Sequence, residues 1–189
     1  MLYLWSSGFK DTTMKRAFIL LAAFSIVFGC SQQDEVAKTS TPSDLTGNSV
    51  TYSLQAGSYW NVDGSIVFNE KTDGTALIEI KINNLGEDDV DQHPVHLHLG
   101  DLSVDKAGVA AQLNPVDGKT GLSTTNLKLL ADESSITYAQ LKELNACIKI
   151  HLAASGEGQS IVLAGSNVGT AVSQAANGRV VSLGVCKSE

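Results

Sequence analysis

The clearest structural signal in this chain is the stretch His93-Pro94-Val95-His96-Leu97-His98-Leu99-Gly100-Asp101. Pro94 and the alternation of histidine with valine and leucine favour an extended backbone. In a β-strand, residues two apart point to the same face, so His96 and His98 project together. The side chains that project to the other face are apolar: Val95, Leu97 and Leu99. The stretch therefore predicts a β-strand with one apolar face and one histidine face.

A second stretch of similar character, Ile148-Lys149-Ile150-His151-Leu152, supplies the fourth histidine of the chain. Two imidazoles on one strand and a third from another strand would give three nitrogen ligands for a copper or zinc ion. We therefore expect His96, His98 and His151 to be metal ligands. His93 is three residues from His96 and faces the other way, so we interpret it as a supporting or structural residue. The alternative, that the histidines only form a polar strand face, stays open.

Short alternating segments with turns between them continue along most of the chain. The expected strands besides the histidine strand are Val50–Leu54, Gly64–Phe68, Thr75–Ile82, Val109–Leu113, Ser123–Leu130, Ala146–Leu152, Ser160–Leu163 and Arg179–Val185. One short helix is expected over Thr137–Leu144, with Ser134 or Ser135 as its cap. Many short strands and a single helix predict an all-β protein with the architecture of a Greek-key β-sandwich.

The first part of the chain has the pattern of a secretory signal. Met14-Lys15-Arg16 is followed by an apolar run over residues 17–28 that is too short for a transmembrane helix. We expect a signal peptide over residues 1–29, with residues 1–13 ahead of a more natural start at Met14. The run ends in Val27-Phe28-Gly29-Cys30, which resembles a bacterial lipobox, so Cys30 is expected to be lipidated. The alternative is an ordinary signal peptide with an incidental cysteine.

The segment after the lipobox lacks apolar periodicity and contains serine, threonine and proline. It predicts a flexible tether over residues 30–48 that leads to one domain over residues 49–189. A lipid on Cys30 would attach the chain to a membrane of the bacterial cell envelope. Ser31 after the cysteine, with acidic residues close behind, is typical of lipoproteins sent to the outer membrane.

The charge of the chain limits its other partners. A formal net charge of −7 and the lack of a basic stripe argue against a nucleic-acid partner. We expect that another protein of the envelope could bind the domain instead. The sequence contains no Ser/His/Asp pattern, phosphate-binding loop or catalytic carboxylate pair that would indicate a particular enzyme.

The cysteines leave two alternatives. With Cys30 lipidated, Cys147 and Cys186 remain as a pair in an oxidising compartment. They either form a disulfide, which would stabilise the fold by roughly 2–4 kcal/mol, or they are two free thiols buried in strands. The sequence does not decide between the two.

One strand arrangement would connect this cysteine pair to the histidines. If Ala146–Leu152 and Arg179–Val185 were antiparallel neighbours, a disulfide between them would place His151 opposite Ser182. Arg179 would then lie just beyond His151, where its charge would attract a small anion to the metal site. The alternative for Arg179 is a solvent-exposed side chain at the start of a strand.

Several segments resemble bacterial proteins with a CHRD domain, which is named for chordin. These are Gly108-Val-Ala-Ala-Gln-Leu-Asn-Pro-Val-Asp-Gly-Lys-Thr-Gly121, Ile136-Thr-Tyr-Ala-Gln-Leu141, Ile148-Lys-Ile-His-Leu152 and Leu163-Ala-Gly-Ser-Asn-Val-Gly169. Such proteins pair a His-x-His strand with a later strand that ends in Val/Ile-His. The resemblance covers about residues 50–170 and implies a β-sandwich. Bacterial members mostly have no assigned activity, so it implies no particular reaction.

The histidine stretch also resembles the run His-Gly-Phe-His-Val-His-Glu-Phe-Gly-Asp of Cu/Zn superoxide dismutases. That resemblance implies a dismutase-like or immunoglobulin-like sandwich in which His96, His98 and His151 fall on copper ligands and His93 on a structural histidine. Ala176-Asn-Gly-Arg179 is similar to the turn whose arginine guides superoxide. No histidine lies between His98 and His151, so a dismutase-type zinc site is not expected. The resemblance then implies one copper ion, with zinc as the alternative.

These observations lead to three expectations for the function. The first is an envelope lipoprotein whose CHRD-like domain is a copper- or zinc-binding module or an interaction module. The second is a copper-dependent enzyme similar to superoxide dismutase, with Arg179 as the candidate anion guide. The third is a structural domain for adhesion or assembly whose histidines bind no metal.

Overall fold

The computed structural model describes residues 44–57, 60–86, 89, 91–104 and 107–176. The elements in chain order are β1 (Leu45–Ser53), β2 (Gln55–Ala56), β3 (Asp63–Lys71), β4 (Ala76–Asn83), β5 (Gln92–Leu99), β6 (Val109–Asp117), β7 (Leu122–Leu127), α1 (Tyr138–Glu143), β8 (Asn145–His151), the 3-10 helix η2 (Glu157–Ser160), β9 (Val162–Gly169) and α2 (Ala171–Ala176). Within the described ranges, no helix combines the length and the apolar character needed to cross a membrane.

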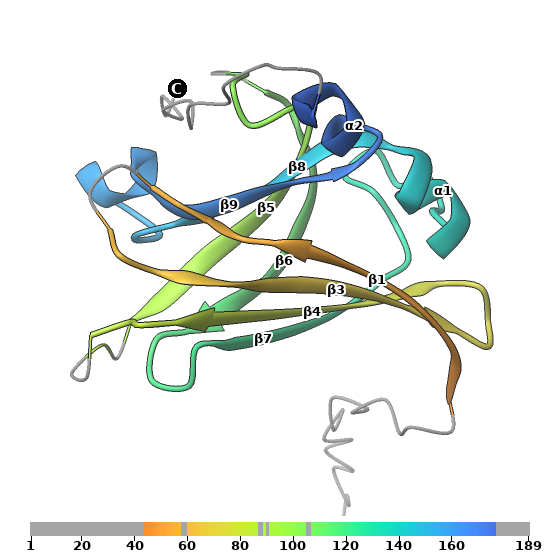
Figure 1. The fold of residues 1–189 in the computed structure, drawn as a ribbon, viewed down its shortest axis with the longest axis horizontal. Coiled ribbons are helices and arrows are strands. Elements are labelled where there is room, and N and C mark those ends of the chain that lie inside the picture. Colours follow the sequence, from red (N-terminus) through yellow and green to blue (C-terminus); the bar gives the residue numbers. More distant parts are fainter. Residues whose placement is uncertain (1–43, 58–59, 87–88, 90, 105–106, 177–189) are drawn as a thin grey trace, which may run out of the picture. The chain divides into compact units, whose positions relative to one another are not determined.

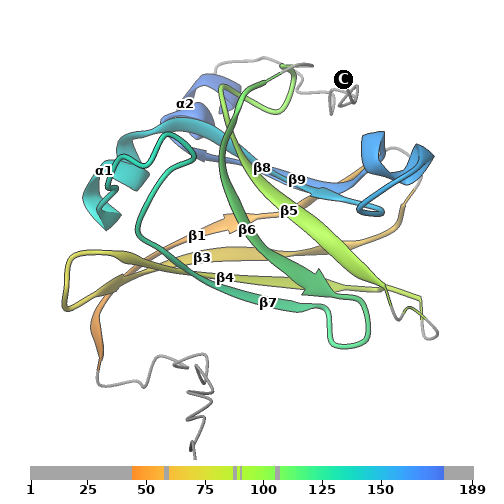
Figure 2. The same ribbon diagram turned by 180° about the vertical axis from the view of Figure 1, so that it is seen from behind.

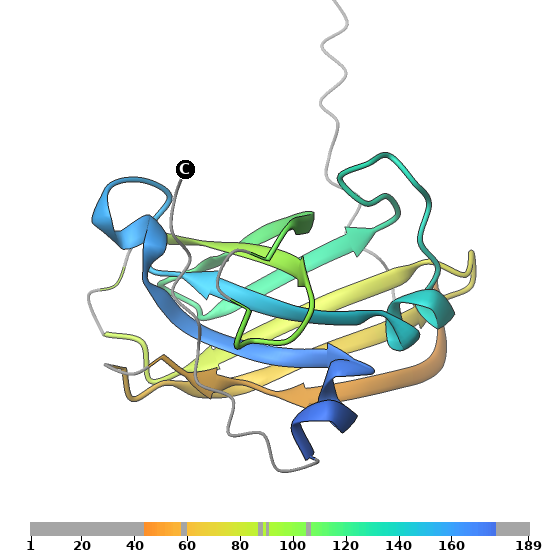
Figure 3. The ribbon, with the colours of Figure 1, turned by 90° about the horizontal axis from the view of Figure 1, so that it is seen from above.

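The nine strands form one antiparallel sheet in the order β1-β3-β4-β7-β6-β5-β8-β9-β2. Strands β7, β6 and β5 are neighbours, and β8 returns past them to pair with β5, which is a Greek-key arrangement. The sheet curls so that β1, β3, β4 and β7 lie across from β5, β8 and β9 (Figures 1 and 3). Because β2 follows β1 directly and pairs with β9, the two ends of the sheet nearly meet. The prediction of an all-β sandwich is confirmed.

The core fills the space between the two halves of the sheet. Strand β4 shows how the sequence builds it, because Ile78, Ile80 and Ile82 are buried while Glu79 and Lys81 are exposed. The other half of the sheet contributes matching apolar side chains: Val95 and Leu97 from β5, Ile148 and Ile150 from β8, and Leu163 and Val168 from β9. Each such side chain contributes about 1.5–3 kcal/mol when it is fully buried.

In the described part of the chain, two short α-helices lie beside the sheet, where one was expected (Figure 2). The predicted helix is present as α1, but its cap is Thr137 and not Ser134 or Ser135. Thr137 caps the helix because its hydroxyl accepts from the backbone N–H of Gln140, and the Gln140 side chain accepts from the backbone N–H of Thr137. Helix α2 has only six residues, too few to show a helical period in the sequence.

Strand boundaries differ from the prediction at both ends of the described domain. Strand β1 begins at Leu45, inside the segment expected to be a tether, and its first residues pair with the end of β3. Strand β9 runs over Val162–Gly169, although only its first two residues were expected to be extended. Seven of its residues are buried, so the strand lacks the polar–apolar alternation by which a half-buried strand is predicted.

Candidate metal centre

Strands β5 and β8 position three histidines on one face of the sheet. The two strands are antiparallel neighbours in which His96 pairs with Lys149 and His98 with Cys147. Residues that alternate with these point into the apolar core: Val95, Leu97, Ile148 and Ile150. Because neighbouring residues of a strand point to opposite faces, His96 and His98 share the other face with Lys149 and His151. The expected alternation ends at Leu99, which is 49% exposed because β5 ends there, beyond the core.

The three imidazoles converge, as the sequence predicted. One nitrogen from each of His96, His98 and His151 can be chosen so that all lie within 4.8 Å of one another. The ring centroid of His96 is 4.9 Å from that of His151 and 5.7 Å from that of His98. A zinc or copper ion binds nitrogen at about 2.0–2.1 Å, so small rotations of the rings would bring the three nitrogens to one ion.

Hydrogen bonds fix the protonation of two of these rings. Nδ1 of His98 lies 2.9 Å from the carbonyl oxygen of Ala107, and Nδ1 of His151 lies 2.9 Å from that of Gln159. A carbonyl oxygen only accepts, so Nδ1 carries the hydrogen in both rings and Nε2 keeps a free lone pair. Both Nε2 atoms are buried, and neither has a hydrogen-bond partner among the described residues. The pair therefore has the protonation and the vacant nitrogens that a metal ion requires.

Burial also favours the neutral form of these histidines. It lowers the pKa of His151 from 6.5 to about 4, with smaller contributions from the neighbouring His96 and His98. Burial is likewise the main reason that the pKa of His98 and the pKa of His96 are lowered. At neutral pH the three rings are uncharged, and protons do not compete with a metal ion for their nitrogens.

Two connecting segments cover the histidine face of the sheet. The segment after β5 buries Leu102 completely, and the Leu102 N–H donates to Oδ1 of Asn167 on β9 over 2.8 Å. The segment after β8 includes η2 and supplies the Gln159 carbonyl that accepts from His151. His98 and His151 are only 4% and 3% exposed, whereas His96 is half-buried. An ion at this site would be enclosed on the side of His98 and His151 and approached past His96.

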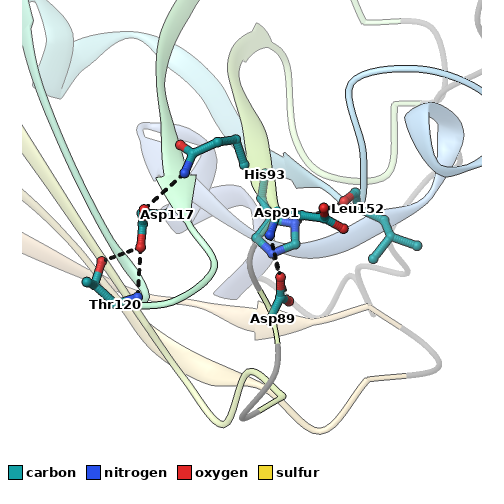
Figure 4. A network of polar contacts seen from close by, with 7 residues as sticks. Asp89, Asp91, His93, Asp117, Thr120 and Leu152 are labelled. Atoms are coloured by element: carbon teal, nitrogen blue, oxygen red, sulfur yellow. Dashed lines mark hydrogen bonds and ion pairs between the residues drawn. The ribbon is translucent and has the colours of Figure 1, made fainter.

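His93 lies apart from this cluster and forms a hydrogen bond with the backbone just after β8. Its Nδ1 donates to the carbonyl oxygen of Leu152 over 2.9 Å, and its Nε2 lies 3.1 Å from Oδ2 of Asp89 (Figure 4). The side chain is 1% exposed. It follows that both nitrogens of His93 have protein partners, and neither is available to the metal ion. The contact between His93 and Asp89 was not predicted, because the acidic loop that contains Asp89 has no periodic pattern from which the direction of its side chain could be inferred.

Strand β8 has no free edge for a further neighbour. It pairs with β5 on one side and β9 on the other over Ala146–Ile150. At the β9 edge, His151 pairs with Val162. The strand predicted over Arg179–Val185, with Ser182, lies outside the described residues.

Several predicted features lie outside the described residues. These are the signal peptide over 1–29, Cys30, Arg179 and Cys186. Cys147 is fully buried on β8, opposite His98 and Asn167. A disulfide between Cys147 and Cys186, and a role for Arg179 as an anion guide, stay predictions.

Sequence reasoning missed one charged residue on the histidine face. Lys149 lies two residues before His151 and directly opposite His96, and it is fully buried. The alternation Ile148-Lys149-Ile150-His151 contained this signal, because it places the lysine on the face of His151. The covering segments remove that face from water, which the alternation alone does not indicate.

Fold and site together define an all-β domain with a buried three-histidine cluster that could hold a metal ion. Comparisons with protein families, with curated proteins and with solved structures found no match to this chain. The function of this chain is therefore inferred from its site alone.

Proposed function

We propose that this domain binds one copper or zinc ion through His96, His98 and His151. The observation that carries the proposal is the pair of buried Nε2 atoms on His98 and His151, which have no partner among the described residues. A buried polar atom without a hydrogen bond costs about 1–3 kcal/mol, and a metal ion bound to both nitrogens would remove that cost. The third nitrogen, from the half-buried His96, would complete a ligand set with a further position open to solvent.

We further propose that the domain works as a lipoprotein of the bacterial cell envelope, attached through Cys30 to the outer membrane. The basic start, short apolar run and Gly29-Cys30 junction support this location. At a membrane surface the metal site would serve as a binding module, either for the ion itself or for an envelope protein that recognises the loaded domain.

A copper enzyme is the second candidate function. The half-buried His96 would leave one side of the ion open, so a small oxidant or reductant could reach it. Copper would supply one-electron chemistry at that position. The residues of this chain would hold the ion through three neutral imidazoles and keep His98 and His151 out of water.

Superoxide turnover by the copper-loaded full chain, measured beside a His98→Gln variant, separates these functions. Bound metal without turnover supports the binding module, and turnover that disappears together with the metal in His98→Gln supports the enzyme. If the wild-type chain holds no more metal than His98→Gln, the metal function is wrong, and a structural adhesion or assembly role is the better account.

A further inference from the structure

Lys149 places a buried positive charge beside the proposed metal ligands. The side chain is 0% exposed, and the residue lies directly opposite His96 in the β5–β8 ladder. Its Nζ donates to the carbonyl oxygen of Val104 over 3.0 Å. The two ion pairs in the described part of the chain, His93–Asp89 and Lys128–Asp73, do not involve it.

The contact described for this ammonium is with a neutral group, the carbonyl of Val104. A buried charge is costly unless it is paired, and one carbonyl oxygen supplies only a partial negative charge. Lys149 lies opposite His96 and two residues before His151 on the same face, so its positive charge lies beside the site. It is among the smaller causes that lower the pKa of His98 and the pKa of His151.

The charge that disfavours a proton on these rings also opposes a metal ion bound to them. Coulomb repulsion scales with the charge of the ion, so Lys149 opposes a dication twice as strongly as a monocation. The expected ligands do nothing to offset this, because three neutral imidazoles carry no negative charge. Among the described residues, no carboxylate or thiol belongs to the cluster.

Three protein ligands suit Cu(I) without a fourth ligand, whereas Zn(II) would need a water at the open position beside His96. Zn(II) at a site with three protein ligands takes a fourth ligand, and Cu(II) prefers a tetragonal set of nitrogen and oxygen ligands. Cu(I) has a filled d shell, so it imposes no such geometry and is satisfied by three nitrogens. The enclosed side of the cluster, at His98 and His151, has no additional donor within the group.

We propose that the site selects monovalent copper, Cu(I), over Cu(II) and Zn(II), and that the buried charge of Lys149 sets this preference. The proposal rests on the metal function proposed above. It assigns Lys149 the role of a residue that determines metal specificity without touching the ion.

The test compares Cu(I) with Zn(II), two ions with filled d shells that differ in charge. Affinities of the full chain for each ion are measured by chelator competition, with Cu(I) handled without oxygen, in wild type, Lys149→Gln and Lys128→Gln. Lys128 is a matched control because its side chain is 60% exposed, so its charge is screened by water. Binding is counted as the part lost in His98→Gln, which removes any contribution from cysteine thiols.

Lys149→Gln is expected to raise the affinity for Zn(II) by roughly tenfold more than the affinity for Cu(I), because one extra unit of repulsion is removed from the dication. Lys128→Gln is expected to leave the ratio unchanged. An unchanged ratio in Lys149→Gln, with Cu(I) binding intact, overturns the role of Lys149 and leaves the metal function standing. If the wild-type chain binds neither ion beyond His98→Gln, the metal function and this inference fail together.

Discussion

His98 and His151 stand on different strands, yet each donates its Nδ1 hydrogen to a backbone carbonyl oxygen 2.9 Å away. The acceptors, Ala107 and Gln159, belong to the two segments that cover the sheet. Each hydrogen bond leaves Nε2 without its proton, and burial leaves that atom without water. Two separate loops thus leave Nε2 of both rings free to bind the same ion. Hydrogen bonding within the domain gives no reason for both atoms to lack a partner.

Metal binding is expected to stabilise the folded chain. An ion that binds the folded state and not the unfolded state, at one hundred times its dissociation constant, adds about 2.7 kcal/mol to the free energy of unfolding. Urea titrations with and without the ion measure this difference. His98→Gln is the control, and it should show little or no gain. Equal stabilisation of both proteins would place the ion somewhere other than the histidine cluster.

The metal-free chain is expected to lose stability as the pH falls from 7 to 5. An unfolded histidine takes up a proton near its ordinary pKa of 6.5, whereas burial lowers the folded pKa of His151 to about 4. Between these values the unfolded chain binds more protons, so protonation favours unfolding. Carboxylates such as Asp73, whose pKa is lowered from 3.8, take up protons only below pH 4 and do not contribute to the loss between pH 7 and pH 5.

Denaturation at pH 7 and pH 5 measures the effect, and His151→Gln serves as the comparison. The variant should lose less free energy of unfolding between the two pH values than the wild type does. A loss of the same size in both proteins would show that His151 does not titrate as its burial implies.

His93 is expected to matter for stability and not for metal binding. Replacement by glutamine breaks its contacts with Leu152 and Asp89 in a buried place, and should cost about 1–3 kcal/mol. Metal stoichiometry should stay at the wild-type value. His98→Gln should do the reverse, with the metal lost and a smaller change in the stability of the metal-free chain. Loss of metal in a well-folded His93→Gln variant would contradict this division of roles.

The alternation of residues predicted the faces of β5 and β8, because the periodicity of a strand is local and survives in any all-β fold. That His151 could meet His96 and His98 was a hypothesis from the sequence, and the pairing of β5 with β8 in the structure is what brings the three rings together. What lies above these faces was not predictable. The covering segments have no period, and they decide that His98, His151 and Lys149 are buried.

The strand order beside the site was also beyond local reasoning. Strand β9 contains Gly165, Ser166 and Asn167, which favour loops by composition. All three are buried in a strand next to β8, and Oδ1 of Asn167 accepts from the backbone N–H of Leu102 in the covering segment. Tertiary packing overrides composition there, so the strand predicted over Ser160–Leu163 ended too early.

Two turn glycines provide a matched test of the packing between β4 and the β6–β7 turn. Gly121 and Gly74 both have positive φ, +69° and +79°. A Cβ on Gly121 would lie 2.3 Å from the carbonyl oxygen of Ile82, whereas a Cβ on Gly74 would meet nothing within 4 Å. Gly74→Ala should cost about 1–2 kcal/mol for its conformation alone, and Gly121→Ala about 2–5 kcal/mol, since the clash adds to it.

Thermal or urea unfolding of the two variants measures the difference. Equal destabilisation would mean that the turn and Ile82 can separate without cost, and that the approach of the β6–β7 turn to β4 contributes nothing to the fold.

The metal content of the purified chain bears most directly on the proposed site. The full chain, prepared without a histidine tag, is loaded separately with copper and with zinc, dialysed, and measured by elemental analysis beside a His96→Ala/His98→Ala variant. We expect close to one ion per wild-type chain and none above background in the variant, because His151 alone cannot hold the ion. Equal metal in both proteins, or none in the wild type, would contradict a metal site formed by these three histidines.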